Sequence, residues 1–195
     1  MEIKNTLYVT NRKKWRVWLV KNHKTQKEVW LIYYRKKTGK SRISYDDAVL
    51  EALCYGWIDS TIKKVDRERF AQRFSPRSQK SKLSQMNKER IRELIKEKKI
   101  TKWGLKAVAH VFNPKTDKPN DFVIPVEIMK ALKANKKAWK HFQKMPSSYQ
   151  RIRVAYIKGH RRHDDMYKKT LARFIKMTAQ NKRIGFVRER RDVTI

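Results

Sequence analysis

The spacing of hydrophobic residues changes along the chain, and this change separates an N-terminal part containing strands from a C-terminal part made of helices. Residues 29–34 are β-branched, aromatic or leucine throughout, which predicts a strand that is apolar on both faces. Residues 57–64 and 69–74 alternate on either side of a short turn, which predicts an antiparallel hairpin. After about residue 121 only the helical period remains. We therefore predict an α+β fold, with an N-terminal antiparallel sheet and packed helices followed by an all-helical C-terminal region.

Capping residues place the helices of the N-terminal part. Thr10 is expected to cap a first helix that ends near Asn22. Ser44 is expected to cap a central helix, with Asp47 as the acid of a capping box, and Gly56 suits the left-handed residue that ends it. Two further helices are predicted to start at Ser84 and Thr101.

The best boundary in the chain follows Pro114. Residues 115–121 contain no aliphatic or aromatic side chain, which favours a linker. The predicted organisation is an α+β domain at residues 1–114, a linker at 115–124, helices at 125–180 and a basic tail at 181–195. Within the helical region, Pro125 fits the first turn of a helix and Pro146 breaks the pattern.

Positive charge dominates the composition. The chain has 51 Lys and Arg against 18 Asp and Glu, a net charge of +33 that is spread over its whole length. Self-repulsion of this size lowers stability unless an anionic partner neutralises it, and nucleic acid is the commonest such partner. The only cysteine excludes an intrachain disulfide, and no apolar run reaches membrane-spanning length. We expect a cytoplasmic protein that makes no membrane contact.

Basic runs interleaved with aromatic residues are the strongest functional signal. They are expected to contact phosphate backbones rather than to read sequence, because no helix-turn-helix, finger or RNA-recognition pattern is visible. The candidate nucleic-acid-binding residues are Arg12, Lys13, Lys14, Arg35, Lys36, Lys37, Arg69, Arg73, Arg77, Lys80, Lys82, Arg161, Arg162, Lys182, Arg183, Arg188, Arg190 and Arg191.

The stretch Ala52–Asp59 contains the other candidate site. Cys54, Trp57 and Asp59 are close together at the junction of a helix and a strand, so they form a candidate pocket. Asp59 is expected to face arginines of the hairpin; it then either forms a salt bridge or orients Arg73 and Arg77 toward phosphate.

The sequence gives little support for a catalytic site or a metal site. A lone cysteine at the end of an apolar helix is more often a small buried hydrophobe than a nucleophile. His160 and His163 share a helical spacing but lack a third ligand. No nucleotide-binding glycine loop is present. We expect no catalytic residue, no metal and no cofactor.

Several segments resemble the YdeI/OmpD-associated family, also described as bacteriocin-protection proteins. The most specific is Ala52–Asp59, and the other matching segments are Trp15–Leu19, Glu28–Leu31, Arg73–Arg77, Pro125, Ala131–Leu132 and Trp139–Phe142. The chain departs from the family pattern at Leu83–Ser84, where the family has Trp-Ser. It departs again at Asp165–Met166, where the family has Thr-Arg. The resemblance implies an α+β N-terminal domain and a helical C-terminal region, and it implies no particular chemistry.

The function expected from the sequence is non-enzymatic binding of nucleic acid, either structured RNA or the ribosome, or nucleoid DNA. Two alternatives stay open. The chain is a stress or bacteriocin-protection factor that acts through a protein partner, or it binds a small ligand at the pocket of Cys54, Trp57 and Asp59.

Overall fold

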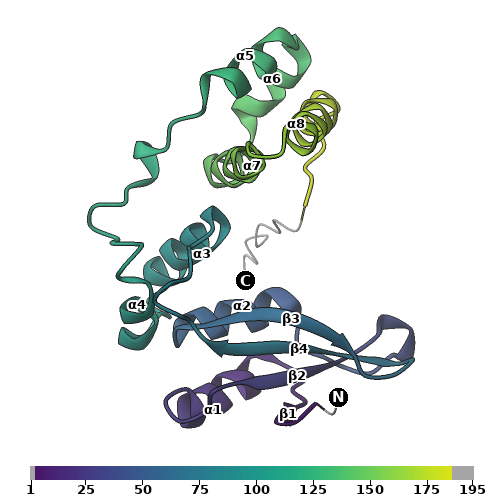
Figure 1. The fold of residues 1–195 in the computed structure, drawn as a ribbon, viewed down its shortest axis with the longest axis vertical. Helices are drawn as coiled ribbons and strands as arrows, with labels where there is room; N and C mark the ends of the chain where they lie inside the picture. The colour runs from purple at the N-terminus through teal and green to yellow at the C-terminus, as the bar shows by residue number, and fades with distance from the viewer. Residues whose placement is uncertain (1–2, 186–195) are drawn as a thin grey trace, which may run out of the picture. The chain divides into compact units, whose positions relative to one another are not determined.

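The chain folds into two compact units that divide between Thr116 and Asp117. This computed structural model describes residues 3–185. The first unit contains a sheet with helices, and the second contains helices without strands in its described part (Figure 1). The predicted α+β class is confirmed.

The sheet of the first unit has the spatial order β1-β2-β4-β3. Its strands are β1 (Thr6–Leu7), β2 (Val29–Tyr34), β3 (Trp57–Lys64) and β4 (Arg69–Pro76). The short β1 runs parallel to β2, and the other pairs are antiparallel. The predicted strand and hairpin are thus confirmed, while β1 is an edge strand that two residues were too few to predict.

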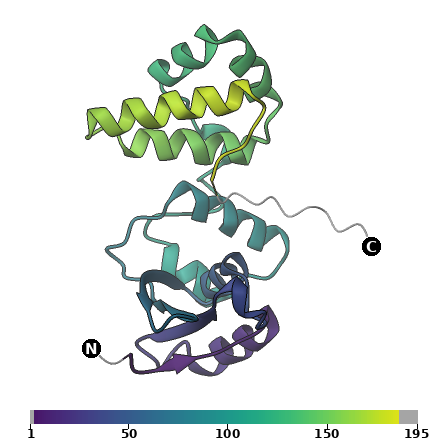
Figure 2. The same cartoon turned by 90° about the vertical axis from the view of Figure 1, so that its right-hand side faces the viewer.

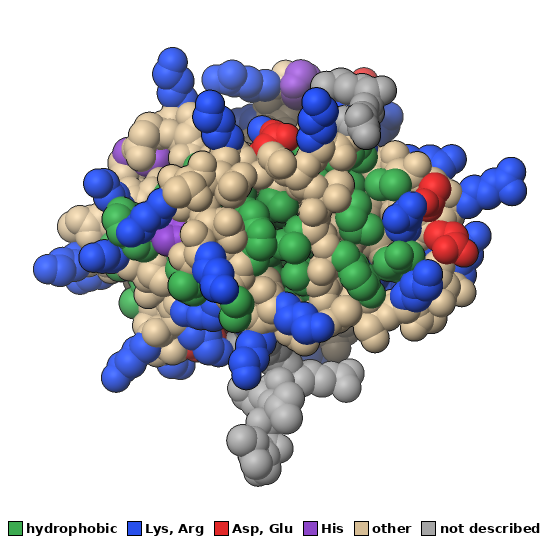
Figure 3. Space-filling model, turned by 90° about the horizontal axis from the view of Figure 1, so that it is seen from below, with side chains coloured by type: hydrophobic (Ala, Val, Ile, Leu, Met, Phe, Trp, Pro, Cys, Tyr) green, Lys and Arg blue, Asp and Glu red, His purple; other side chains and the backbone are tan. Residues whose placement is uncertain are grey.

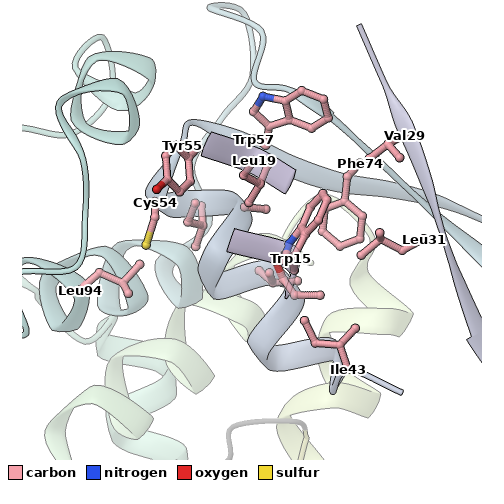
Figure 4. Packing of buried hydrophobic residues seen from close by; sticks show 14 of the residues in the cluster. Trp15, Leu19, Val29, Leu31, Ile43, Cys54, Tyr55, Trp57, Phe74 and Leu94 are labelled. Carbon is pink, nitrogen blue, oxygen red and sulfur yellow. Dashed lines mark hydrogen bonds between the residues drawn. The ribbon is translucent and has the colours of Figure 1, made fainter. Parts of the chain in front are cut away.

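Four α-helices and one short 3-10 helix complete the described part of the first unit. They are α1 (Arg12–Asn22), η1 (Lys36–Thr38), α2 (Tyr45–Cys54), α3 (Gln85–Lys96) and α4 (Lys102–Val108). Helices α1 and α2 lie on the same side of the sheet (Figure 2). Their apolar residues, including Trp15 and Leu19, pack against Leu31 and Phe74 of the strands (Figure 4). The Trp15 indole is fully buried, and its Nε1 donates to the Ala48 carbonyl at 3.0 Å, which satisfies its only polar atom.

The caps of α2, α3 and α4 are Ser44, Ser84 and Thr101, as predicted, and the cap of α1 differs. Ser44 Oγ accepts from the Asp47 amide at 3.0 Å, as predicted for α2. Helix α1 is capped by Asn11, whose side chain accepts from the Lys14 amide at 2.9 Å, so the prediction of Thr10 as its cap was wrong. Both residue types can cap, but asparagine is the better N-cap, and it stands one residue nearer to the helix.

The C-terminus of α2 meets the N-terminus of α4 at close range. The Thr101 amide and Oγ1 both donate to the Cys54 carbonyl, at 3.1 and 2.6 Å. A Cβ at Gly104 would lie 2.5 Å from that same oxygen, and a Cβ at Gly56 would lie 2.5 Å from Ala107 Cβ. Gly56 has φ = +74°, the left-handed conformation predicted for it. The two glycines therefore permit a contact that satisfies the last carbonyls of α2 and joins helix ends of opposite partial charge.

The second unit has its own core. Its described helices are η2 (Pro119–Asp121), α5 (Val126–Ala134), α6 (Lys136–Lys144), α7 (Ser147–Gly159) and α8 (Asp164–Ala179). Ile128, Leu132, Phe142, Tyr149 and Phe174 are almost completely buried against one another. None of the helices in residues 3–185 combines the length and hydropathy needed to cross a bilayer.

We predict that Gly56→Ala destabilises the first unit more than Gly39→Ala does. Both glycines have positive φ, which costs a residue with a Cβ about 1–2 kcal/mol. Only Gly56 has a neighbour within 4 Å of its Cβ position, which adds about 1–3 kcal/mol of overpacking. Denaturant unfolding followed by tryptophan fluorescence measures both losses, because five of the six tryptophans lie in the first unit. Equal losses would contradict the close approach of α4.

Candidate nucleic-acid interface

The residues of the candidate pocket do not converge on a shared space. Cys54 and Trp57 are both buried, and the Trp57 Nε1 donates to the His23 carbonyl at 3.1 Å. Figure 4 shows the Cys54 sulfur near Leu94, with the Trp57 indole pointing away from it. Burial raises the pKa of the Cys54 thiol to about 11, so it is neutral at physiological pH. Cys54 and Trp57 thus serve the core of the first unit.

Asp59 has a different partner from the one expected. It lies opposite Phe74 in the sheet register, whereas Arg73 lies opposite Trp30, so the two side chains point to opposite faces. Asp59 Oδ2 accepts a hydrogen bond from the Tyr45 hydroxyl at 2.6 Å. The expected pairing of Asp59 with the hairpin arginines is therefore not observed. The pairing register of β3 with β4 also shifts between Asp59 and Ile62. Such a shift changes which residues lie opposite each other, and the alternation of the sequence does not reveal it.

The arginines of the hairpin have partners of their own. Arg73 Nε pairs with Glu28 at 2.6 Å, and this contact lowers the pKa of the Glu28 carboxyl. Arg69 pairs with Asp66 at 2.7 Å. Both arginines therefore form ion pairs with acidic residues of the first unit.

Arg77 and Arg12 also make contacts within the first unit. Arg77 is only 6% exposed, its Nη2 donates to the Lys82 carbonyl at 2.6 Å, and burial lowers its pKa. Its guanidinium therefore closes the loop between β4 and α3. Arg12 pairs with Glu51 and Asp47 of α2. Arg12, Arg69, Arg73 and Arg77 are therefore not part of the proposed interface.

One group of predicted basic residues gathers at an end of the sheet. The Arg35 amide donates to the Glu68 carbonyl at 2.8 Å, which places η1 beside the turn of the β3–β4 hairpin. We call the exposed cations of these two segments the sheet-end cluster: Arg35, Lys36, Lys37, Lys40, Lys64 and Arg67. On the face seen in Figure 3, Lys and Arg side chains project in all directions, and Asp and Glu are few.

The remaining predicted residues are exposed but dispersed. They are Lys13, Lys14, Lys80, Lys82, Arg161, Arg162, Lys182 and Arg183. Arg161 pairs with Glu127 at 2.6 Å, and the Arg183 guanidinium lies 5.8 Å from the centre of the Tyr149 ring. Arg188, Arg190 and Arg191 lie outside the described residues.

A second basic surface was missed by the sequence prediction. Helices α5 and α6 carry six exposed lysines, which we call the lysine row: Lys130, Lys133, Lys136, Lys137, Lys140 and Lys144. On each helix these lysines are opposite the buried stripe, which is Ile128 and Leu132 on α5, and Ala138 and Phe142 on α6. Within residues 3–185, no acidic side chain forms an ion pair with the row. The prediction favoured contiguous basic runs, whereas these lysines are mostly separated by helical spacing.

A simple sequence signal identifies the same surface. No Asp or Glu occurs between Glu127 and Asp164, although this stretch contains eleven Lys and Arg. We call residues 128–163 the acid-free stretch. It covers most of α5 and all of α6 and α7, so these cations have no acidic residue between them in the sequence.

The connection between α5 and α6 is a single residue. The Asn135 amide donates to the Leu132 carbonyl at 3.2 Å, and its side chain accepts from the Ala138 amide at 3.0 Å. Asn135 thus ends α5 and caps α6 at once. The two helices that carry the lysines are therefore joined by one residue that is hydrogen-bonded to both of them.

The structure offers no arrangement for a metal among the residues it describes. Within that part of the chain, no group of three or more His, Cys, Asp or Glu side chains is placed to hold an ion. His160 contacts the Tyr156 ring, with the ring centres 4.7 Å apart.

Two families match different parts of the chain. Residues 7–107, which span most of the first unit, match the family described as a domain of unknown function (DUF8412). The chain belongs to this family. Residues 121–181, which contain the helices α5 to α8, match the family described as bacteriocin-protection, YdeI or OmpD-associated.

The resemblance to the YdeI/OmpD-associated family is therefore confirmed for the helical region. The stretch Ala52–Asp59, on which that resemblance most depended, lies in the part that matches the other family. Searches of curated proteins and of solved structures gave no match.

We predict that the Cys54 thiol of the folded protein is almost unreactive toward a disulfide reagent at pH 8. With the pKa near 11 instead of about 8.5, the thiolate fraction falls by about two orders of magnitude, and burial blocks access as well. The neutral thiol favours the folded state below about pH 8.5, and this contribution is lost as the pH rises toward 11. The control is labelling of Cys54 in the protein unfolded by denaturant, where the reaction should go to completion. Rapid labelling of the folded protein would reopen the small-ligand alternative.

Proposed function

We propose that the protein binds nucleic acid through its phosphate backbone, with the lysine row as the principal contact surface. The observation that supports this is the row itself: six exposed lysines on two helices joined by one residue, with no ion pair to an acid in the described chain. Lysine presents a compact point charge on a flexible stem, which can contact a phosphate without the fixed geometry of a bidentate arginine contact.

The physical argument concerns the cost of the row without a partner. Lys136 and Lys140, and Lys140 and Lys144, are like charges four residues apart on one helix. Each such pair destabilises a helix by about 0.2–0.5 kcal/mol. A phosphate backbone removes this repulsion and releases condensed counterions, so binding is favoured by the same charges that weaken the free helix.

The sheet-end cluster is proposed as a second phosphate contact, on the first unit. Glu68 and the paired Asp66 lie in the same hairpin turn, so the net charge of this surface is lower than that of the lysine row. The mode of binding is proposed to depend on backbone and shape rather than on base sequence. The proposed targets are structured RNA, including the ribosome, or nucleoid DNA in the cytoplasm.

We predict that replacing Lys136, Lys140 and Lys144 by glutamine weakens binding to RNA and DNA by on the order of tenfold or more near 0.1 M salt. Losing three phosphate contacts should also reduce the slope of log Kd against log salt by about 2 to 3. Fluorescence anisotropy with nuclease-treated, nucleic-acid-free protein measures both quantities.

The matched control replaces Lys96, Lys106 and Lys115, which are exposed lysines of the first unit, by glutamine. It changes the net charge by the same amount, so it should leave affinity and salt slope close to those of the parent. Equal effects of the two triple variants would mean that net charge alone drives binding. A parent protein that binds neither RNA nor DNA at low salt would end the proposal.

A second candidate function is protection through a protein partner, which the description of the family matched at residues 121–181 suggests. It predicts that a protein remains bound after nuclease treatment and a wash near 0.5 M salt. It also predicts that the lysine-row variant still captures this protein. Recovery of nucleic acid alone, lost on nuclease treatment, would favour the first proposal.

A further inference from the structure

Tyr156 is an exposed aromatic residue inside the acid-free stretch. It lies on α7, and it is 52% exposed. Single exposed aromatic residues are common on protein surfaces, so exposure alone carries no argument. The argument comes from the groups that hold this ring and from the charges around it.

A buried arginine supports the Tyr156 ring. The Arg153 guanidinium lies 5.5 Å from the centre of the Tyr156 ring and 5.8 Å from that of Tyr149, and Arg153 is only 7% exposed. Burial lowers the pKa of Arg153, which reflects how far its guanidinium has left water. The guanidinium is thus within cation–π distance of two aromatic rings, and both contacts are favourable.

The C-terminal end of the described chain fixes this arginine in place. The Ile184 amide donates to the Tyr149 hydroxyl at 2.9 Å, and a Cβ at Gly185 would overlap the Arg153 guanidinium. Arg153 is thus enclosed between α7 and residues 183–185. Tyr156 therefore rests on a cation that has little freedom to move, so the ring is oriented before any ligand arrives.

The remaining surroundings of Tyr156 are basic. His160 meets the ring edge to face, with an interplanar angle of 71°. Lys158 and Arg162 are exposed nearby in sequence, and no acid lies within the stretch. An exposed, oriented ring among cations matches how proteins hold single strands: cations follow the backbone and aromatic rings stack on bases.

We propose that Tyr156 stacks on an unpaired base, and that the helical unit therefore prefers single-stranded nucleic acid to duplex. This inference rests on the proposed function, because the lysine row supplies the phosphate contacts. It adds a substrate class, since the bases of a duplex are already stacked on one another and offer no free face to a side chain.

The test compares the parent protein with Tyr156→Ala and Tyr156→Phe on a single strand of roughly 20 nucleotides and on its duplex, a length above the usual site size. Tyr156→Ala is expected to weaken single-strand binding by about 5- to 150-fold, which corresponds to about 1–3 kcal/mol of stacking free energy. Duplex binding should change less than about twofold. Tyr156→Phe keeps the ring and should retain the preference.

The matched control is Tyr45→Ala, which removes a tyrosine of similar exposure that contacts Asp59 in the first unit. It should leave the ratio of single-strand to duplex affinity unchanged. Thermal unfolding of each variant checks that it is folded. Photo-crosslinking of the parent to a bromouridine-substituted strand, followed by peptide mapping, should identify Tyr156 as a contact residue.

The outcomes separate this inference from the proposed function. A change below about fivefold in the affinity ratio on Tyr156→Ala overturns the inference, as does an equal loss on both forms, which indicates that Tyr156 only covers Arg153. In both cases nucleic-acid binding itself survives. A parent protein that binds neither form ends both proposals.

Discussion

The meeting of α2 and α4 at the Cys54 carbonyl is the constraint on which the first unit depends. Thr101 caps α4 and at the same time donates two hydrogen bonds to the last turn of α2. Gly56 then reverses the backbone, so β3 can begin at the next residue. The contact does not tolerate a side chain at Gly104, because the nearest atoms there are backbone carbonyls that cannot move aside. The sheet, the central helix and the helices after the sheet are therefore fixed relative to one another by one small junction.

The two units use their positive charge in different ways. In the first unit, arginines pair with the few acids available: Arg12 with Glu51, Arg73 with Glu28, and Arg90 with Asp46. These pairs join separate elements, and the flat guanidinium suits such fixed contacts. In the second unit, the lysine row has no acid to pair with in the described chain. Ion pairs between separate elements are thus made by arginine, whereas the row, which forms no ion pair in the described chain, consists of lysines.

Local signals predicted local structure well. The run at 29–34, the cap at Ser44 and the glycine at position 56 each depend on a few adjacent residues, and each was found as expected. Contacts between distant elements were not predictable in the same way. The partner of Asp59 depends on the sheet register and on a bulge, and the burial of Arg77 depends on how a loop closes over it. The lysine row could have been predicted from the sequence, because finding it requires only the helical period and a count of acidic residues.

The single residue between α5 and α6 has a consequence for how such a surface works. With Asn135 serving both helix ends, neither helix can slide or turn without breaking a cap. The backbone positions that carry the row therefore keep a preset spacing in the free protein, in contrast to positions on a flexible segment, which must be ordered on binding. A ligand whose own charges repeat at a matching interval loses less entropy on this surface than one with the same total charge and a different spacing. For the proposed binding of nucleic acid, the joint would add selection by geometry to a general attraction between opposite charges.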